Sequence, residues 1–101
     1  MTGEVYTLGV WRVLAGREDE FVERWRSLGG VFRALPDPPV GEGTLLRSVD
    51  DPRQFYSYGP WPSAAAVAAM RTQPSATEAI AALTALCEEA RPGLYTVAAR
   101  A

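Results

Sequence analysis

The sequence predicts an α+β protein of the ferredoxin-like class, in which a four-stranded antiparallel sheet carries its helices on one face. The first observation is the order of the periodic segments, which is β-α-β-β-α-β with the second helical region divided at Gln73-Pro74. The second is the tight turn over residues 50–53, because a short turn joins strands that pair antiparallel. Right-handed crossovers then place the helices on one side of the sheet. A length of 101 residues fits one domain over positions 1–101.

The first predicted strand covers residues 4–13 and is apolar on both of its alternating faces. One face carries Thr7, Gly9 and Trp11, and the other carries Tyr6, Leu8 and Val10. A strand with one face in water alternates more clearly between apolar and polar residues. We therefore expect the sheet to be covered twice, by its own helices and by a second copy of the chain in a homodimer.

The first helix is predicted from Arg17 to about Leu35. Acidic residues crowd its first turn, where the helix dipole favours negative charge. Apolar side chains then follow a helical spacing at Phe21, Trp25, Leu28 and Phe32. Gly29-Gly30 is expected to weaken or kink this helix. A loop rich in Pro and Gly follows over residues 36–43.

Strand patterns cover residues 44–49 and 54–59, on either side of the Asp51-Pro52 turn. Trp61 lies between two prolines, and Ser63 is placed to cap a helix over residues 63–71. Ser75 and Glu78 have the spacing of a capping box, which predicts a third helix from there to about Ala90. Pro92-Gly93 should end it, and residues 94–99 should form the last strand.

Composition excludes several classes of function. The net charge of −2 provides no electrostatic attraction to nucleic acid or to an anionic membrane. The sequence has no His, which is the commonest metal ligand, and its one Cys cannot form a thiolate metal cluster. Cys87 is expected to be a buried structural thiol within the third helix. No apolar run has transmembrane length and no signal pattern precedes the first strand, so a cytoplasmic protein is expected.

Three segments together resemble the antibiotic biosynthesis monooxygenase family of small dimeric α+β barrels. They are the opening strand with residues 16–21 after it, the Asp51-Pro52 turn with its aromatic strand, and Trp61 two residues before Ser63 at the head of an Ala-rich helix. The resemblance implies two sheets packed face to face, with an aromatic substrate bound between sheet and helices. Some members oxygenate polycyclic phenols or quinols without metal or flavin, some degrade haem, and others have no known activity.

The haem-degrading branch resembles this chain at Trp61 but differs at two other positions. Its Asn and His fall on Gly9 and Arg71 here, and the chain contains no His. Arg does not normally lose its proton and is a poor ligand for haem iron. Haem degradation by the family mechanism is therefore not expected, and no cofactor is predicted.

The resemblance also implies which residues form the site. Thr7, Gly9 and Trp11 would face the helices, as would Phe55, Ser57 and Trp61, while Tyr56 and Tyr58 would face the partner's sheet. With Phe21, Trp25 and Met70 these residues would wall an aromatic cavity. Trp61 and Arg71 are the candidate catalytic residues, and the others are candidates for substrate binding: Thr7, Gly9, Trp11, Phe21, Trp25, Phe55, Ser57 and Met70.

Structural interpretations of the same residues remain open. Large rings usually fill cores, so Phe21, Trp25 and Phe32 can be core residues alone. Trp61 can contact a ligand or simply pack, and Arg71 can be a solvated helix-end cation or a clamp for a phenolate or carboxylate. The acidic residues offer no convincing catalytic pair, and no general base stands out.

Three functions are consistent with these observations. The first is a cofactor-independent monooxygenase that acts with O₂ on an aromatic phenol or quinol, because such a ring, once deprotonated, can pass an electron to O₂ itself. The second is a ligand-binding or structural dimer without catalysis, which explains the missing base. The third is a polyketide cyclase or isomerase, which would form product without oxygen.

Overall fold

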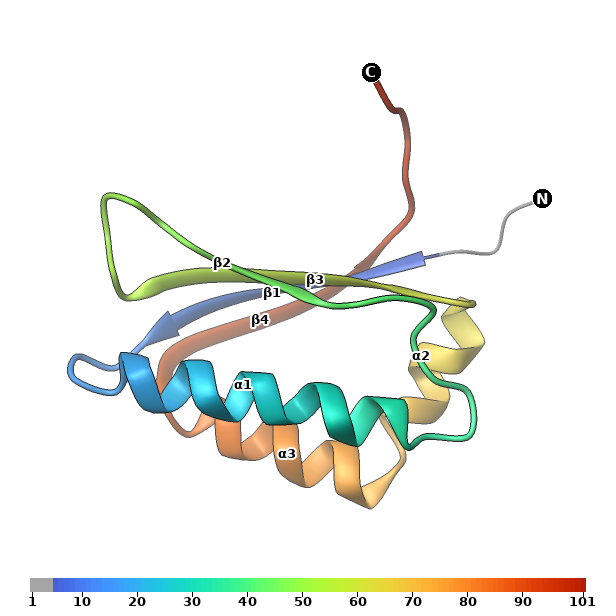
Figure 1. Ribbon diagram of the computed structural model, residues 1–101, viewed down its shortest axis with the longest axis horizontal. Helices are drawn as coiled ribbons and strands as arrows, with labels where there is room; N and C mark the ends of the chain where they lie inside the picture. The colour runs from blue at the N-terminus through green and yellow to red at the C-terminus, as the bar shows by residue number, and fades with distance from the viewer. Residues whose placement is uncertain (1–4) are drawn as a thin grey trace.

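A computed structural model describes residues 5–101 and shows two layers, a sheet and the helices beneath it (Figure 1). The elements follow one another as β1 (Val5–Val13), α1 (Glu18–Arg33), β2 (Thr44–Arg47), β3 (Gln54–Trp61), α2 (Ala64–Met70), α3 (Pro74–Thr84) and β4 (Cys87–Tyr95). The four strands lie in the order β2-β3-β1-β4, and all neighbours pair antiparallel. The predicted ferredoxin-like α+β fold is confirmed.

The central pair of strands fixes which side chains meet the helices. β1 and β3 pair with Gly9 opposite Ser57 and Trp11 opposite Phe55. Since residues directly opposite each other point to the same face, the buried Val5, Val13 and Trp61 mark the helix side. The predicted assignment of the two faces of β1 and β3 is confirmed, and Glu4 lies outside the described residues.

α1 runs as one helix through Gly29-Gly30, so the two glycines do not end it. Phe21 and Leu28 are buried on its inner side, and Val31 and Phe32 pack against a second cluster further along. Each such buried side chain stabilises the fold by about 1.5–3 kcal/mol, which exceeds the penalty of about 1 kcal/mol for each helical glycine. Gly16, with φ of 85°, makes the turn between β1 and α1.

The core consists of two clusters. One joins β1, α1, β3 and α3 through Val13, Phe21, Leu28, Phe55, Leu83 and Leu86. The other lies where the end of α1 meets α2 and contains Val5, Leu35, Trp61, Ala66, Val67, Met70 and Ala76. Phe32 and Ile80 pack against both clusters. These two residues therefore join the two clusters into one continuous core beneath the sheet.

The caps of the two later helices differ from each other. Ser63 caps α2 as predicted, because its Oγ accepts a hydrogen bond of 3.1 Å from the Ala66 N–H. The predicted capping box at Ser75 and Glu78 is wrong, because α3 already begins at Pro74. Its N-cap residue is Gln73, whose side chain makes no capping hydrogen bond. Proline at the first helical position has the φ that a helix needs and lacks only a donor that would be unpaired anyway.

The prediction for the C-terminal quarter is wrong. α3 ends at Thr84, and Cys87–Tyr95 forms β4, where the sequence predicted helix to Ala90 and a strand over 94–99. β4 pairs with β1 along nearly its whole length, with an irregularity beside Arg12 and Val13. Pro92 is tolerated because β4 is an edge strand of the sheet. Cys87 is half-buried in this strand, and burial raises the pKa of its thiol.

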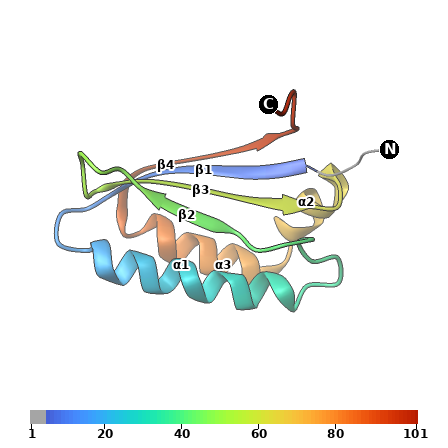
Figure 2. The same ribbon diagram turned by 45° about the horizontal axis from the view of Figure 1, so that its top comes forward.

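The face of the sheet away from the helices has no covering layer within residues 5–101 (Figure 2). Large apolar side chains are exposed on it, among them Leu46, Tyr56, Tyr58 and Tyr95. Beyond β4 the chain extends away from the sheet (Figure 1). Within the described part of the chain, no helix has the length and apolarity to cross a membrane.

Candidate functional site

A cavity of about 300 Å³ lies between the inner face of the sheet and the helices. β1 and β3 contribute one wall, α1 contributes the opposite wall, and Met70 and Arg71 close one end from α2. The loop over residues 39–43 lines it as well. Apolar and aromatic groups dominate the lining, which is typical of sites that bind small organic molecules.

Most of the residues predicted for the site lie on this cavity. Its lining includes Thr7, Gly9, Trp11, Trp25, Ser57, Trp61, Met70 and Arg71. Phe21 and Phe55 are not among the residues that line it and belong to the core cluster beneath. Their ring centroids lie 5.1 Å apart, and Phe21 lies 5.4 Å from the ring of Trp11. These two residues therefore support the cavity wall and do not form it.

Two hydroxyl groups hold the two indole rings of the sheet. Trp11 Nε1 donates to Ser57 Oγ at 3.0 Å, and Trp61 Nε1 donates to Thr7 Oγ1 at 3.2 Å. Phe32 packs edge-on against Trp61 with centroids 5.1 Å apart. A hydroxyl that accepts one hydrogen bond keeps its own proton for donation. Thr7 and Ser57 thus bring two O–H donors to the cavity wall.

Gly9 makes the first of these contacts possible. A Cβ atom at this position would lie 2.6 Å from Trp11 Nε1 and 2.8 Å from Ser57 Oγ. Any larger residue would displace the hydrogen bond that fixes Trp11.

The loop before β2 approaches the site through two further glycines. A Cβ on Gly59 would lie 3.2 Å from Gly43 Cα, and a Cβ on Gly43 would lie 3.4 Å from the Trp25 ring. The loop therefore crosses β3 closely and covers Trp25. The Gly41-Glu42-Gly43 run was the sequence signal for this contact, but nothing local indicated which element the loop would meet.

Charged groups at the cavity were mostly missed from the sequence. Arg26, Arg33 and Glu42 line it together with Arg71. Arg26 forms an ion pair with Glu23 on the same helix. Among residues 5–101 that line the cavity, Glu42 is the one carboxylate. The site therefore combines aromatic walls, two hydroxyl donors and a rim in which cations outnumber anions.

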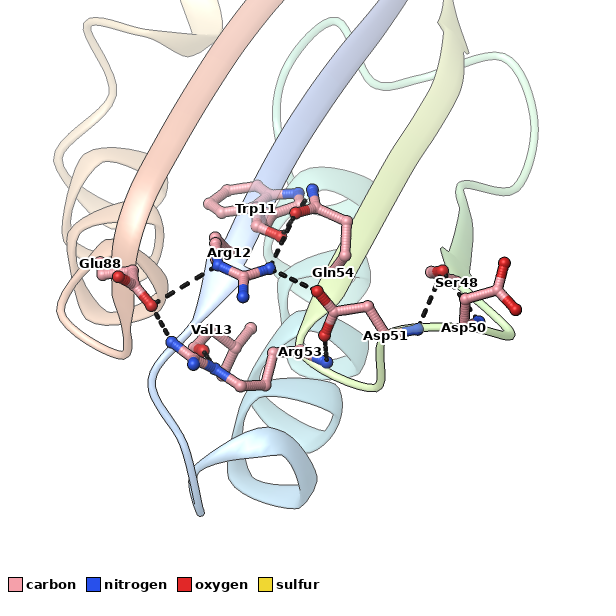
Figure 3. Close-up of polar contacts among 9 residues, drawn as sticks. All are labelled: Trp11, Arg12, Val13, Ser48, Asp50, Asp51, Arg53, Gln54 and Glu88. Carbon is pink, nitrogen blue, oxygen red and sulfur yellow. Dashed lines mark hydrogen bonds and ion pairs between the residues drawn. The ribbon is translucent and has the colours of Figure 1, made fainter.

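A second polar cluster joins the end of β1 to the β2–β3 turn and to β4 (Figure 3). Arg12 Nη1 donates to Asp51 Oδ2 at 2.6 Å, and Glu88 pairs with both Arg12 and Arg53. The hydrogen bond from Arg12, aided by the Arg53 N–H, lowers the pKa of Asp51. Within the described residues, no group of three or more His, Cys, Asp or Glu side chains is placed to hold a metal ion.

Comparison with known proteins defines the class to which this fold belongs. No family model matches the chain, and no curated protein matches it in sequence. Solved structures do match, and several of them are antibiotic biosynthesis monooxygenases, as the motifs indicated. The resemblance to that family is confirmed in three dimensions.

Three neighbours illustrate the likeness. SnoaB, a cofactor-independent oxygenase from Streptomyces nogalater, superposes with a TM-score of 0.85 at 24% identity, covering 98% of this chain and 97% of its own. A protein from Bordetella bronchiseptica described as an antibiotic biosynthesis monooxygenase gives 0.83 at 15% identity, with 97% and 100% coverage. One from Nitrosomonas europaea gives 0.79 at 17%, with 97% and 93% coverage. At these identities the likeness establishes a shared fold.

Proposed function

We propose that this chain is a cofactor-independent monooxygenase that acts on an aromatic phenol or quinol. The observation that carries the proposal is the aromatic cavity in which Thr7 and Ser57 hold two indole rings and keep two O–H donors. The fold shared with SnoaB, a cofactor-independent oxygenase, supports it.

The chemistry needs a bound ring, a lost proton and molecular oxygen. The ring anion passes one electron to O₂, which gives a ring radical and superoxide. Their combination forms a C–O bond, the peroxide takes up the proton that the phenol released, and loss of water leaves the quinone. The protein must bind the ring, exclude water and stabilise the anion.

Each role falls to a residue on the cavity wall. Trp11 and Trp61 would grip the ring, and the hydroxyls of Thr7 and Ser57 would donate to its oxygen atom as negative charge develops. Arg71 would stabilise the anion from the end of α2. Glu42 would accept the phenol proton and return it to the peroxide, since it is the carboxylate that lines the described part of the cavity.

Oxygen uptake with a panel of hydroquinones, anthrones and naphthols tests these roles. We expect uptake above the autoxidation rate, reduced about 10- to 100-fold in Ser57→Ala and Arg71→Gln, because each loses a group that stabilises the anion. Glu42→Gln should slow weakly acidic phenols more than acidic ones. Arg24→Gln, whose guanidinium pairs with Glu20 away from the cavity, is the matched control. Unchanged turnover in all three site variants would refute the roles.

A binding protein without catalysis is the second candidate. The observation that favours it is the single carboxylate, Glu42, among the described residues that line the cavity, because catalysis without a cofactor needs a group that accepts the phenol proton. Ligand binding without oxygen consumption would identify this case. A cyclase or isomerase of the same fold would instead form product under anaerobic conditions.

The proposal includes a homodimer. The open face of the sheet exposes Leu46, Tyr56, Tyr58 and Tyr95, and apolar surface of this kind is typical of a protein–protein interface. A second copy packed on this face would also account for the two apolar faces of β1. A cytoplasmic location, expected from the sequence, remains part of the proposal.

A further inference from the structure

Arg33 lies in the last turn of α1 and lines the cavity. A Cβ atom at Gly29, one turn earlier, would lie 3.2 Å from Arg33 Nη1 and 3.7 Å from Nη2. The guanidinium group therefore folds back over Gly29, along the helix surface toward the cavity.

The neighbouring Gly30 makes no such contact, so the contact with the Arg33 guanidinium is specific to position 29. A Cβ at Gly30 would meet nothing within 4 Å. Both glycines are in the interior of the same helix, where glycine is less favourable than alanine. Gly29 therefore provides space for the guanidinium, while Gly30 borders open space.

The charges around the cavity mouth give Arg33 a role in binding. Arg26 is paired with Glu23, so its charge is partly offset. Within residues 5–101 no carboxylate lies within ion-pair distance of Arg33 or Arg71. The end of α1 and α2 share a hydrophobic cluster, so the two arginines approach the cavity from neighbouring elements. Glu42 is the opposing charge on this rim.

We propose that the cavity selects ring compounds that carry an anionic substituent such as a carboxylate, and that Arg33, seated over Gly29, binds that substituent. This inference rests on the proposed binding of an aromatic ring in the cavity and specifies its substrate class. The guanidinium presents a planar fork of donors that matches a carboxylate in two parallel hydrogen bonds. The aromatic walls would hold the ring while Arg33 fixes its charged end at the mouth.

A matched pair of probes tests this directly. Anthracenecarboxylate and anthracenemethanol share a ring and differ in the charged group, and their binding can be followed by probe fluorescence anisotropy. We expect the wild-type protein to prefer the carboxylate, and Arg33→Gln to reduce that preference roughly tenfold, the effect of one charge-assisted hydrogen bond. Arg26→Gln should reduce it less, because Glu23 already offsets that charge. Added salt should weaken the binding of anthracenecarboxylate and leave the binding of anthracenemethanol unchanged.

The two glycines provide a second, independent variant pair. Gly29→Ala should shift the guanidinium by a few tenths of an ångström and lower the preference by up to about threefold, because bidentate hydrogen bonds depend on geometry. Gly30→Ala gains the same helix propensity and should leave the preference unchanged. A purely structural arginine at the helix end would change stability and not the ratio of the two affinities.

The outcomes separate this inference from the proposed function. Equal preference for the carboxylate in wild type and Arg33→Gln overturns the role of Arg33 while ring binding stands. Equal effects of Gly29→Ala and Gly30→Ala overturn the seating of Arg33 over Gly29. Binding of neither probe to the wild-type protein overturns the inference and the ring-binding cavity together.

Discussion

At the scale of single residues, the hydrogen bond between Trp61 and Thr7 connects stability with the site. Trp61 is 1% exposed, so its indole N–H depends on a protein partner. Removing the acceptor leaves a buried donor unpaired, which is costlier than removing both partners. The same contact fixes the ring that the proposal assigns to substrate binding.

A double-mutant cycle measures this bond. Thr7→Val keeps the side-chain shape and should lower the free energy of unfolding by about 1–3 kcal/mol. In a Trp61→Phe background the same substitution should have almost no effect, because no N–H remains to be left unpaired. Urea unfolding of the four proteins gives the coupling energy. An equal loss in both backgrounds would mean that the bond contributes nothing.

Several site residues could be predicted from the sequence and others could not. The family resemblance placed Thr7, Gly9 and Ser57 on the helix side, whereas strand alternation alone could not choose between the two apolar faces of β1. Arg33 was missed as a site residue. The i, i+4 spacing of a helix places its side chain over Gly29, but only the fold shows that this part of α1 borders the cavity. Glu42 was missed for a similar reason, because its loop has no periodicity and its position depends on contacts with β3 and Trp25.

At the scale of elements, β4 shows where local pattern fails. Residues 85–90 are strong helix formers by composition, and a helix was predicted there. Pairing with β1 prevails, because the sheet would otherwise leave that edge of β1 open. Glu88, which falls in the segment predicted as helix, is a partner of Arg12 and Arg53 in the sheet. Sequence reasoning found the elements of the first two thirds because each had a strong turn or cap beside it.

The polar cluster around Asp51, at the β2–β3 turn, should make the free energy of unfolding depend on pH. Because the folded pKa of Asp51 is lowered below its ordinary value of 3.8, its ionised form stabilises the fold above that value, and this contribution disappears as pH falls through the folded pKa. Asp51→Asn should therefore be less stable than wild type at neutral pH, with the gap closing in acid.

Urea unfolding at a series of pH values checks this, with Asp50→Asn as the matched control. Asp50 is the preceding residue, is exposed, and forms no side-chain ion pair within the described chain. Its substitution should leave the pH dependence of wild type intact. A constant gap for Asp51→Asn across the acid range would contradict the assignment of this carboxylate.

At the scale of the whole molecule, the exposed sheet face predicts self-association. Leu46 is 50% exposed on β2 and lies on the open face beside Tyr56, while Val49 is 98% exposed in the turn beyond it. Leu46→Glu should convert a dimer into monomer, because it places a charge inside an apolar interface. Light scattering should give twice the chain mass for wild type and for Val49→Glu. A monomeric wild-type protein at micromolar concentration would refute the proposed homodimer.

The most direct test of a monooxygenase activity follows the two atoms of dioxygen into the products. A single turnover of the substrate found in the uptake panel, carried out under isotopically labelled dioxygen, should place one labelled atom in the quinone and the other in water. Mass spectrometry of the product reads this without any assumption about residue roles. One labelled atom per product, formed only with active protein, is the predicted result. Product that forms at the same rate without oxygen, or that carries no label, would contradict a monooxygenase and favour a cyclase or isomerase in the same cavity.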